Sequence, residues 1–313
     1  MVVLGNPVLD YVLQIAQLPS ARVTHQKVHA LYIGPGGAAN LLIGAARLGL
    51  PVQALGIVGD DNVGRRLRRW LDAEEVDTRM LISLPGNRTP RVFILTTPQG
   101  SQTFLGYHPK GYTVPGPPAD WQAAISQAIA LYCDGWSCGG LGISFVQQAV
   151  EQAHKAGVAV FFDLGPQMRS CPAGQLATIL RNTTALTLTE EEARAYLPGP
   201  LALPDLASAL RERGPQLVVI KRGAQGSYIQ CDDEAVLHPG FSVPVRDSTA
   251  AGDAVSAALI WGWLHRCPLP QLADLLNAAG AVAVQRLGGG FNMPRLAEIK
   301  ALLQERGKVA DFM

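Results

Sequence analysis

The stretch from Arg246 to Leu264 reads RDSTAAGDAVSAALIWGWL and is the part of the chain that decides the fold. Its first part, from Asp247 to Gly252, is small and flexible enough for backbone N–H groups to turn toward a ligand. Its second part, from Ala254 to Leu264, is an almost unbroken apolar run, which predicts a helix buried on most of its surface. Asp253 lies at the junction, in the first turn of that helix.

The junction at Asp253 has two interpretations. The exposed N–H groups and the positive dipole end of a helix start bind anions, and a carboxylate beside a bound anion suits proton abstraction from an alcohol that attacks phosphorus. The alternative is that Asp253 caps a core helix, which is the commonest use of Asp at a helix start. Taken alone, the stretch favours capping, so the choice depends on the rest of the chain.

The composition excludes several classes of protein. At 313 residues, of which 48% are apolar, the chain is long for one domain and can fill a sizeable core. Its 26 Lys and Arg residues against 25 Asp and Glu residues give no electrostatic basis for a nucleic-acid partner. No apolar run reaches the length that crosses a bilayer, so we also expect no membrane partner.

Two further features favour the cytoplasm. The five cysteines are scattered and form no C-x-x-C pair, which is typical of reduced thiols rather than of a disulfide framework. The opening residues M-V-V-L-G-N-P contain no basic region, so they predict a first strand rather than a signal peptide. We therefore expect a soluble cytoplasmic protein.

A regular alternation of helices and strands begins at about Trp121. Short apolar strands are predicted at residues 130–133, 158–162, 185–188 and 217–220, with a later antiparallel edge at 228–229 and 235–237. Such a rhythm predicts βαβ units and a mainly parallel sheet covered by helices on both sides. Ligands of these sheets gather where the strands end, and five residues fall at such ends: Asp10, Asp134, Asp163, Thr189 and Gly223.

The first third of the chain predicts shorter elements. Residues 2–4 predict a buried strand that ends in the loop Gly5-Asn6-Pro7, with Asp10 at the end of that loop. Residues 52–58 predict one strand. The stretches 11–33 and 91–107 are strand-like, and the second predicts a hairpin around residues 98–101.

A glycine-rich segment, Gly34-Pro35-Gly36-Gly37-Ala38-Ala39-Asn40, predicts a loop that leads into a helix. It contains G-x-G-x-x-A, and Asp60 follows about twenty residues later, as a dinucleotide-binding fingerprint requires. Glycines that allow close helix–strand packing explain the pattern as well. Nearby, His25 and His29 have the spacing of metal ligands on a helix, but this segment does not have a helical pattern.

Two later stretches carry polar groups at the ends of predicted strands. Lys221 begins the turn K-R-G-A-Q-G, where a basic side chain and glycines can meet a nucleotide phosphate; an ordinary turn is the alternative. Thr189-Glu190-Glu191-Glu192 begins a helix, where carboxylates favour the dipole in any protein. Its functional interpretation is a carboxylate that holds Mg²⁺ through water beside nucleotide phosphates.

In this order the motifs resemble the ribokinase-like sugar and nucleoside kinases, the PfkB family, over essentially the whole chain. Four blocks carry the match: Gly5–Asp10, the glycine loop with Leu48-Gly49 and Val58–Asp61, Lys221–Gly226, and Asp247–Asp253. The last is the most specific, because the family signature D-T-x-[GA]-A-G-D corresponds to D-S-T-A-A-G-D here.

The resemblance implies a ribokinase-like three-layer α/β/α fold with a mainly parallel central sheet. It implies a single kinase domain over residues 1–313, with a small β-sheet lid from about 11–33 and 91–107. The implied activity is that of a phosphotransferase, which transfers the γ-phosphoryl group of ATP, with Mg²⁺, to a hydroxyl of a small sugar or nucleoside. Pairing of two lids in the family implies a homodimer.

The resemblance also implies a role for each matching residue. Asp253 matches the catalytic base, and the anion hole is formed by the backbone amides of Ala250, Ala251 and Gly252. The substrate-binding positions are Asp10, Gly36, Gly37 and Asn40, and the nucleotide-binding positions are Thr189, Lys221, Gly223, Gly226 and Asn277. Glu192 matches the carboxylate near Mg²⁺. Asp247 and Thr249, with the loop 286–288, match a site for a monovalent cation such as K⁺.

Departures from the family pattern leave the substrate open. Thr189 replaces the Asn of the N-x-x-E motif, Lys221 replaces a frequent Thr, and the glycine loop lacks the Lys of ribokinases and phosphofructokinases. The segment Gly5–Asp10 is similar to adenosine kinases, so a nucleoside kinase is the alternative to a sugar kinase. A non-catalytic sugar- or nucleoside-binding protein is disfavoured by the intact Asp253, and a nicotinamide-dependent oxidoreductase leaves D-S-T-A-A-G-D unexplained.

Overall fold

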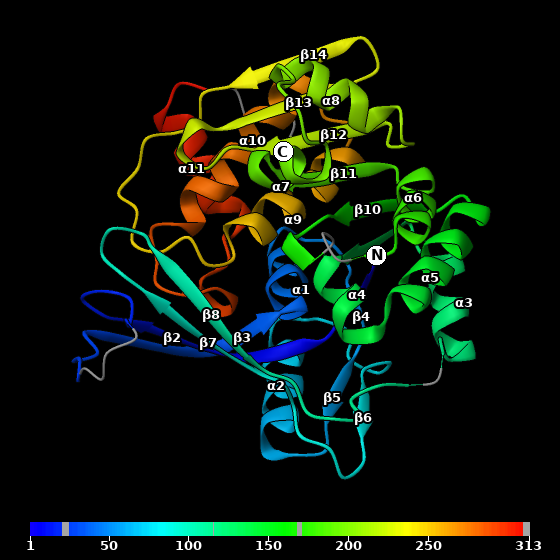
Figure 1. The fold of residues 1–313 in the computed structure, drawn as a ribbon, viewed down its shortest axis with the longest axis vertical. Coiled ribbons are helices and arrows are strands. Elements are labelled where there is room, and N and C mark those ends of the chain that lie inside the picture. The colour runs from blue at the N-terminus through cyan, green and yellow to red at the C-terminus, as the bar shows by residue number, and fades with distance from the viewer. Residues whose placement is uncertain (21–24, 115, 168–170, 309–313) are drawn as a thin grey trace.

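The computed structural model describes residues 1–20, 25–114, 116–167 and 171–308. Its main element is an eight-stranded sheet in the order β14-β13-β12-β11-β10-β9-β1-β4 (Figure 1). The strands from β12 to β4 are parallel, and β13 and β14 add an antiparallel edge, as predicted. Their bounds are β1 Val2–Leu4, β4 Gln53–Leu55, β9 Ala130–Asp134, β10 Ala159–Asp163, β11 Ala185–Thr189, β12 Leu217–Lys221, β13 Ser227–Cys231 and β14 Glu234–His238.

Helices cover both faces of this sheet because its strands are apolar on both sides. Val3, Tyr132 and Phe161 point into one core, and their chain neighbours Val2, Leu131 and Phe162 point into the other. The first core is covered by α1 Ala38–Arg47, α2 Asn62–Ala73, α9 Ala251–Leu264, α10 Leu269–Ala283 and α11 Leu296–Glu305. The second is covered by α3 Ala119–Gln127, α4 Gly135–Leu141, α5 Ile143–Lys155, α6 Ala173–Arg181, α7 Glu190–Tyr196 and α8 Leu203–Arg211.

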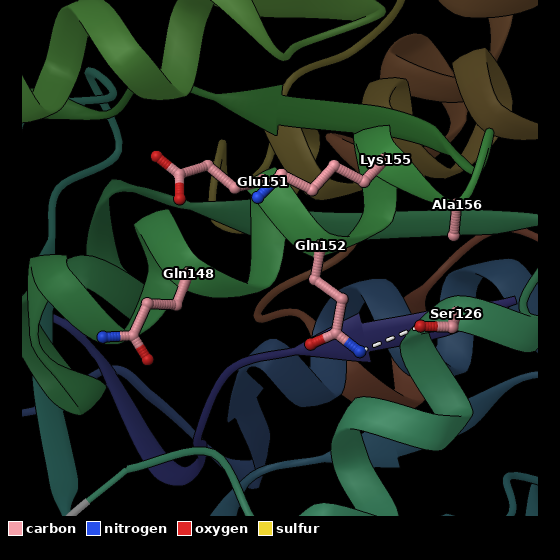
Figure 2. Close-up of a pocket in the computed structure, with 6 residues that line it drawn as sticks. All are labelled: Ser126, Gln148, Glu151, Gln152, Lys155 and Ala156. Carbon is pink, nitrogen blue, oxygen red and sulfur yellow. Dashed lines mark hydrogen bonds between the residues drawn. The ribbon is translucent and has the colours of Figure 1, made fainter.

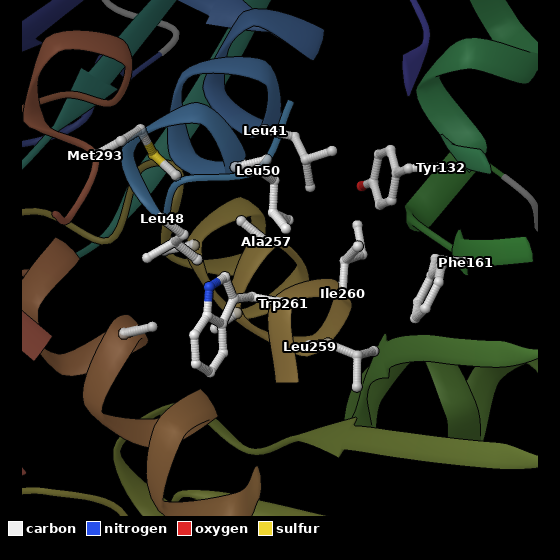
Figure 3. Close-up of a cluster of buried hydrophobic side chains, with 14 of the residues drawn as sticks. Leu41, Leu48, Leu50, Tyr132, Phe161, Ala257, Leu259, Ile260, Trp261 and Met293 are labelled. Carbon is white, nitrogen blue, oxygen red and sulfur yellow. The ribbon is translucent and has the colours of Figure 1, made fainter. Parts of the chain in front are cut away.

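Helix α9 is the centre of the first core, as its apolar sequence predicts. Figure 3 shows Leu259, Ile260 and Trp261 of this helix among side chains from α1 and from the strands. Trp261 is 4% exposed and Ile260 is fully buried. Burial on this scale fixes the helix against the sheet, so its first turn has a defined position. Among the described residues, no helix combines the length and apolarity needed to span a membrane.

A separate four-stranded sheet forms the lid and extends to one side of the molecule (Figure 1). Its inner face packs on the main body, because Val12 and Ile94 form a small core with Leu287. Tyr11 and Phe93 stack on the opposite, outer face. The hairpin predicted for residues 91–107 is confirmed. The strands, in the order β3-β2-β7-β8, are β3 Ala30–Gly37, β2 Pro7–Gln14, β7 Arg91–Thr96 and β8 Gln102–Tyr107.

The single strand predicted for residues 52–58 is wrong. The chain forms β4 in the main sheet and then β5 Ile57–Gly59, which pairs with β6 Ile82–Leu84 in a two-stranded sheet. The break falls at Gly56, where a Cβ atom would overlap the carbonyl oxygen of Gly5. The backbone N–H of Ile57 then donates to Asn6 Oδ1 over 2.9 Å, which turns it away from the main sheet.

Two predicted loops are also strands. β2 begins at Pro7, so Asp10 lies inside a strand rather than at the end of a loop. The glycine segment 34–37 is the second half of β3, where Gly34 pairs with Asp10. Gly37, with a φ of 56°, then turns the chain directly into α1. The loop prediction was wrong because pairing with β2 compensates for the weak strand propensity of glycine.

Candidate active site

The N-terminus of α9 lacks a side-chain cap. Its N-cap residue is Ala250, which has a left-handed φ of 63°, and no side chain accepts from its first turn. The helix begins three residues earlier than the apolar run suggests, so Asp253 is its third residue. The first N–H groups of a helix have no intrahelical acceptor and carry the positive end of the dipole. The N–H of Ala251 donates to the carbonyl oxygen of Ser248 over 3.2 Å, and the N–H groups of Ala250 and Gly252 remain available to an anion.

Asp253 is held by a neighbouring helix rather than by its own. Asn40 Nδ2 in α1 donates to Asp253 Oδ2 over 3.0 Å. The other end of the same amide, Oδ1, accepts from the N–H of Gly290 over 2.8 Å. Asn40 is only 5% exposed, so both bonds fix its orientation. This geometry counts against the interpretation of Asp253 as a helix cap.

Asp10 faces the same region from the lid. It is 3% exposed, and a Cβ atom on Gly36 of the adjacent strand would overlap its carboxylate. Burial, followed by the nearby charges of Asp253 and Asp247, raises the pKa of Asp10 to about 8. A glycine at position 36 is therefore required by the close packing of β2, β3 and this carboxylate.

The charge environment of Asp253 is set by burial and by other carboxylates. Burial, then the charges of Asp134 and Asp163, raise the pKa of Asp253 to about 7, although the Asn40 hydrogen bond and Lys221 oppose the shift. Asp134, at the end of β9, has its pKa raised to about 6, chiefly by burial. Its Oδ1 accepts from the backbone N–H and the hydroxyl of Ser137, so it caps α4.

Among the described residues, Lys221 is the cation that lies beside Gly252. Its Nζ lies 2.6 Å from Asp163 Oδ2 in a largely buried pair, and 3.4 Å from the place a Cβ atom of Gly252 would take. Burial works against its charge, but Asp163, Glu192 and Asp253 raise the pKa of Lys221 overall. Ser256 of α9 also donates to Asp163 Oδ2, over 3.2 Å.

The start of α7 contrasts with that of α9. Thr189 Oγ1 accepts from the N–H of Glu192 over 3.1 Å, and Glu192 Oε2 accepts from the N–H of Thr189 over 2.7 Å. This is a complete capping box, which confirms the helix-start interpretation of the acidic stretch. One oxygen of the Glu192 carboxylate is therefore committed to the backbone.

The remaining positions that the family resemblance assigns to the nucleotide lie near the antiparallel edge. Gly223 and Gly226 have φ values of 56° and 82° and form the turn from β12 to β13. A Cβ atom on Gly226 would overlap the carbonyl oxygen of His238, so this glycine is required by the packing of the edge strands. The Asn277 amide nitrogen donates to Ser227 Oγ over 2.8 Å and to the carbonyl oxygen of Ala273 over 2.7 Å.

Asp247 and Thr249 lie directly before the uncapped helix start. Both are buried, and Thr249 Oγ1 donates to Asp247 Oδ1 over 2.9 Å. Asp247 Oδ2 accepts from the N–H of Gly288 over 2.7 Å, which joins this segment to the loop that was predicted beside it. Among the described residues, no group of three or more His, Cys, Asp or Glu side chains could hold a metal ion.

The lid contacts the same loop. Tyr32 of β3 donates its hydroxyl to the carbonyl oxygen of Gly289 over 2.7 Å and accepts from the N–H of Phe291 over 3.1 Å. Gln102 of β8 donates to Asp247 Oδ1 over 2.6 Å. Asp253 therefore lies where the lid strands meet the loop 286–290 and the start of α9.

Other predicted features lie elsewhere. Gly34 and Gly36 belong to an antiparallel lid strand, and Asp60 is exposed and bonded to Arg65, so the dinucleotide fingerprint is wrong. His25 and His29 are exposed and lie outside any helix. Figure 2 shows a surface hollow between α3 and α5, lined by Ser126, Gln148, Glu151, Gln152, Lys155 and Ala156. It lies near the C-termini of these helices, at the edge opposite the strand ends.

Sequence reasoning missed two residues of the site. Asp163 was placed at a strand end, but its pairing with Lys221 was not predicted; that strand end was the available signal. Gln102 carries no local signal, because its contact with Asp247 spans 145 residues.

The comparisons with known proteins agree with this arrangement. The chain matches the model of the pfkB family carbohydrate kinases over residues 3–296. It is 27% identical over 285 residues to a 5-dehydro-2-deoxygluconokinase of Shouchella clausii, covering 88% of this chain and 87% of the relative. It is 27% identical over 304 residues to an ATP-dependent ribose-1-phosphate kinase of Halopiger xanaduensis, covering 96% and 97%.

A solved structure supports the fold. The ribokinase of Arabidopsis thaliana, determined in complex with ribose and ATP, matches with a TM-score of 0.82 at 21% identity and covers 97% of this chain and 98% of its own. The family match spans nearly the whole chain, and so does the structural likeness. The chain therefore belongs to the pfkB family of carbohydrate kinases and has their ribokinase-like fold.

Proposed function

We propose that the chain transfers the γ-phosphoryl group of ATP to a hydroxyl of a small sugar or nucleoside, with Asp253 as the general base. The observation that carries this proposal is the start of α9, where an uncapped helix N-terminus and a carboxylate held by Asn40 lie together. An anion site next to a base is the arrangement that phosphoryl transfer to an alcohol needs.

Asp253 has properties that suit a general base. Its pKa of about 7 lies close to neutral pH, where a base is both deprotonated and able to accept a proton. The Asn40 bond to Oδ2 leaves Oδ1 to face the incoming hydroxyl. Asp10 supplies a second carboxyl group for the hydroxyl groups of the acceptor, and the missing side chain of Gly36 leaves the space that this group occupies.

The anion hole stabilises the charge that develops on the transferred group. It consists of the N–H groups of Ala250, Ala251 and Gly252 together with the dipole of α9. Lys221 adds a full positive charge beside Gly252 and exchanges its Asp163 partner for phosphate oxygens. In this proposal ATP binding draws Lys221 away from Asp163 and the N–H of Ala251 away from the carbonyl oxygen of Ser248, so donors and cation are in place before the transfer.

The nucleotide lies along the ends of β11 and β12, where it meets Thr189, Lys221, the turn Gly223–Gly226 and Asn277. Glu192 would hold Mg²⁺ through water. Its side chain fits this role because only Oε2 is taken by the capping box, and Mg²⁺ usually keeps several of its water ligands. When bound, Mg²⁺ neutralises phosphate charge.

A homodimer formed through the lid is supported by the outer face of the lid sheet. Ile33, Tyr11, Phe93 and Leu105 lie in one cross-strand row on that face. Ile33 is 40% exposed and Leu105 is 57% exposed, which is unusual for a row of large apolar side chains. Sedimentation of the wild type and of Leu105→Asp tests this: a monomeric wild type would contradict it.

The activity is tested with purified protein, ATP and Mg²⁺ over a panel of sugars, sugar acids, sugar phosphates and nucleosides. We expect one acceptor class to stimulate ADP release, with a product whose mass has increased by one phosphoryl group. A protein that does not bind ATP, or that binds ATP but transfers to no hydroxyl in the panel, would contradict the proposal. Preference for a nucleoside would identify the adenosine-like alternative.

A further inference from the structure

Asp247 Oδ1 has no free lone pair for a metal ion. The residue is 1% exposed. Oδ1 accepts from Gln102 Nε2 over 2.6 Å, from the N–H of Thr249 over 3.2 Å and from Thr249 Oγ1 over 2.9 Å. Oδ2 accepts from the N–H of Gly288 over 2.7 Å. A carboxylate oxygen offers about two lone-pair sites, and three donors already point at Oδ1.

The Gln102 amide is placed where the family resemblance implies a monovalent cation. Its nitrogen lies between Asp247 Oδ1, at 2.6 Å, and Thr249 Oγ1, at 3.3 Å. An amide NH₂ group carries partial positive charge and two donors, so it satisfies two oxygens that a cation would otherwise bind. The residues present therefore do not fit a bound K⁺, because the place between these oxygens is taken.

We propose that Gln102 is a positioning residue that replaces a monovalent cation at the loop before α9, so that phosphoryl transfer by this protein does not require K⁺. The catalytic part of this inference rests on the function proposed above. Gln102 acts through Asp247 and Thr249 and does not touch the reacting groups.

Continuous contacts lead from Gln102 to the reacting groups. Thr249 is followed directly by the anion-hole residues 250–252. Gly288, held by Asp247, belongs to the same glycine run as Gly290, which donates to Asn40, and Asn40 donates to Asp253. A Cβ atom on Gly289 would crowd both Asn40 and Ala250, so this run is packed against the helix start. Loss of the Gln102 bond therefore loosens both the anion hole and the base.

The position of Gln102 in the lid adds a second consequence. Gln102 begins β8, next to the hairpin turn, whereas Asp247 belongs to the main body. The bond forms when this end of the lid lies against the loop. A bound cation would not depend on the position of the lid. Replacement of the cation by Gln102 therefore couples the position of the lid to the order of the anion hole.

The test uses the wild type, Gln102→Ala, Gln102→Glu and the control Thr103→Val. Thr103 is the next residue on β8 and points to the opposite face. Transfer rates and thermal midpoints are measured in KCl, NaCl and tetramethylammonium chloride at equal ionic strength. We expect the transfer rate of the wild type, and likewise that of Thr103→Val, to change by less than about twofold between the salts. A change of this size is well below the effect of losing one hydrogen bond to a charged group.

Gln102→Ala should lose about tenfold in kcat in tetramethylammonium, the size of one hydrogen bond to a charged group, and K⁺ should restore part of that loss. Gln102→Glu should respond to K⁺ more strongly, because its carboxylate adds a negative charge beside Asp247. A wild type that K⁺ activates as strongly as Gln102→Ala would overturn the inference. So would a Gln102→Ala protein with wild-type kcat in every salt.

Thermal midpoints separate this inference from the proposed function. If no acceptor is phosphorylated, the proposed function fails, but the midpoints still decide the role of Gln102. K⁺ should raise the midpoint of Gln102→Ala relative to tetramethylammonium and leave that of the wild type unchanged. An equal rise in both proteins would show that the cation binds beside Gln102 and would overturn the replacement.

Discussion

Two helices begin near the ends of neighbouring strands of the central sheet, and their N-termini are completed in opposite ways. α7 begins with a capping box, in which Thr189 and Glu192 satisfy each other's backbone N–H groups. α9 begins at Ala250, in a left-handed conformation, with no side-chain acceptor. The first helix start needs nothing from outside the protein. The second leaves donors free beside Asp253 and Lys221.

The difference shows where this fold accommodates a ligand. A non-glycine residue in the left-handed region costs roughly 1 kcal/mol, and a missing N-cap costs a similar amount. Buried carboxylates with raised pKa values add to the strain at α9, at Asp10 and at Asp253. These unfavourable features are concentrated at one helix start, which is the pattern expected of a functional site.

Removing the charge beside α9 should have the largest effect among the variants that spare Asp253. Lys221→Met removes the cation next to Gly252 and the ion-pair partner of Asp163. We expect kcat to fall about 10²-fold, as for the loss of one preorganised transition-state contact. Steady-state kinetics measure it, with Lys155→Met, an exposed lysine of α5, as the control. Equal rates for the two variants would remove the distinction between the helix starts.

The pH dependence of the reaction should report the carboxylate at α9. A general base works when deprotonated, so kcat/KM should fall as the pH drops below about 7, the pKa of Asp253. The decline should approach tenfold per pH unit on the acid side. A rate profile on the wild type checks this. An acid limb centred near the ordinary pKa of Asp, about 4, would show that this carboxylate is not the base.

The stability of the fold should also vary with pH because of Asp10. Its folded-state pKa is raised to about 8. Between the ordinary value and about 8 the folded protein therefore holds a proton that the unfolded chain releases, so stability falls as pH rises through this window. Asp10→Asn removes this loss, so its advantage in the free energy of unfolding should grow with pH.

The advantage of Asp10→Asn should exceed roughly 1 kcal/mol at the upper end of the window. Chemical denaturation at several pH values measures it. Asp233→Asn, at an exposed position of the turn between β13 and β14, is the comparison. An advantage that is constant with pH would show that Asp10 ionises normally.

Substitutions at the capped start of α7 should change the stability of the protein more than its reaction rate. Thr189→Ala removes the cap of α7 and should cost about 1 kcal/mol in the free energy of unfolding. Thr189→Asn keeps a capping side chain and should retain most of that stability. We expect kcat of both variants to remain within about tenfold of the wild type, because the side chain mainly serves the helix. A rate loss as large as that of Lys221→Met would mean that α7 belongs to the reaction as much as α9.

The smallest effect is expected at the N-cap of α9. Ala250→Gly relieves the left-handed strain and should change the free energy of unfolding by about 0.5 to 1 kcal/mol in the stabilising direction. Thermal denaturation measures it, and Ala177→Gly in the interior of α6 should move the other way. Destabilisation by Ala250→Gly would mean that packing of the Ala250 methyl group against Gly289 contributes more stability than the left-handed conformation costs.

Much of the sheet was predictable because its signal is local. The predicted strands 130–133, 185–188 and 217–220 differ from the observed ones by one residue at one end. The start of α9 was also predictable from the local sequence, because small residues followed by an apolar run mark it. The glycine-rich strand 34–37 was not, because its conformation is imposed by pairing with β2.

The interior of the site was less predictable because its contacts join distant segments. Asn40 and Asp253 are 213 residues apart, and Gln102 and Asp247 are 145 residues apart. No periodicity or spacing encodes such a pair. The resemblance to a kinase family supplied Asn40 and Asp253 as separate positions, and the structure supplies the bond between them.

The most direct test of the account compares Asp253→Asn with the wild type on the acceptor identified above. We expect the variant to lose at least about 10³-fold in kcat, because the base is gone. It should still bind ATP with nearly unchanged affinity, since the helix start and Lys221 are intact. Transfer by Asp253→Asn at a rate close to that of the wild type would contradict the account.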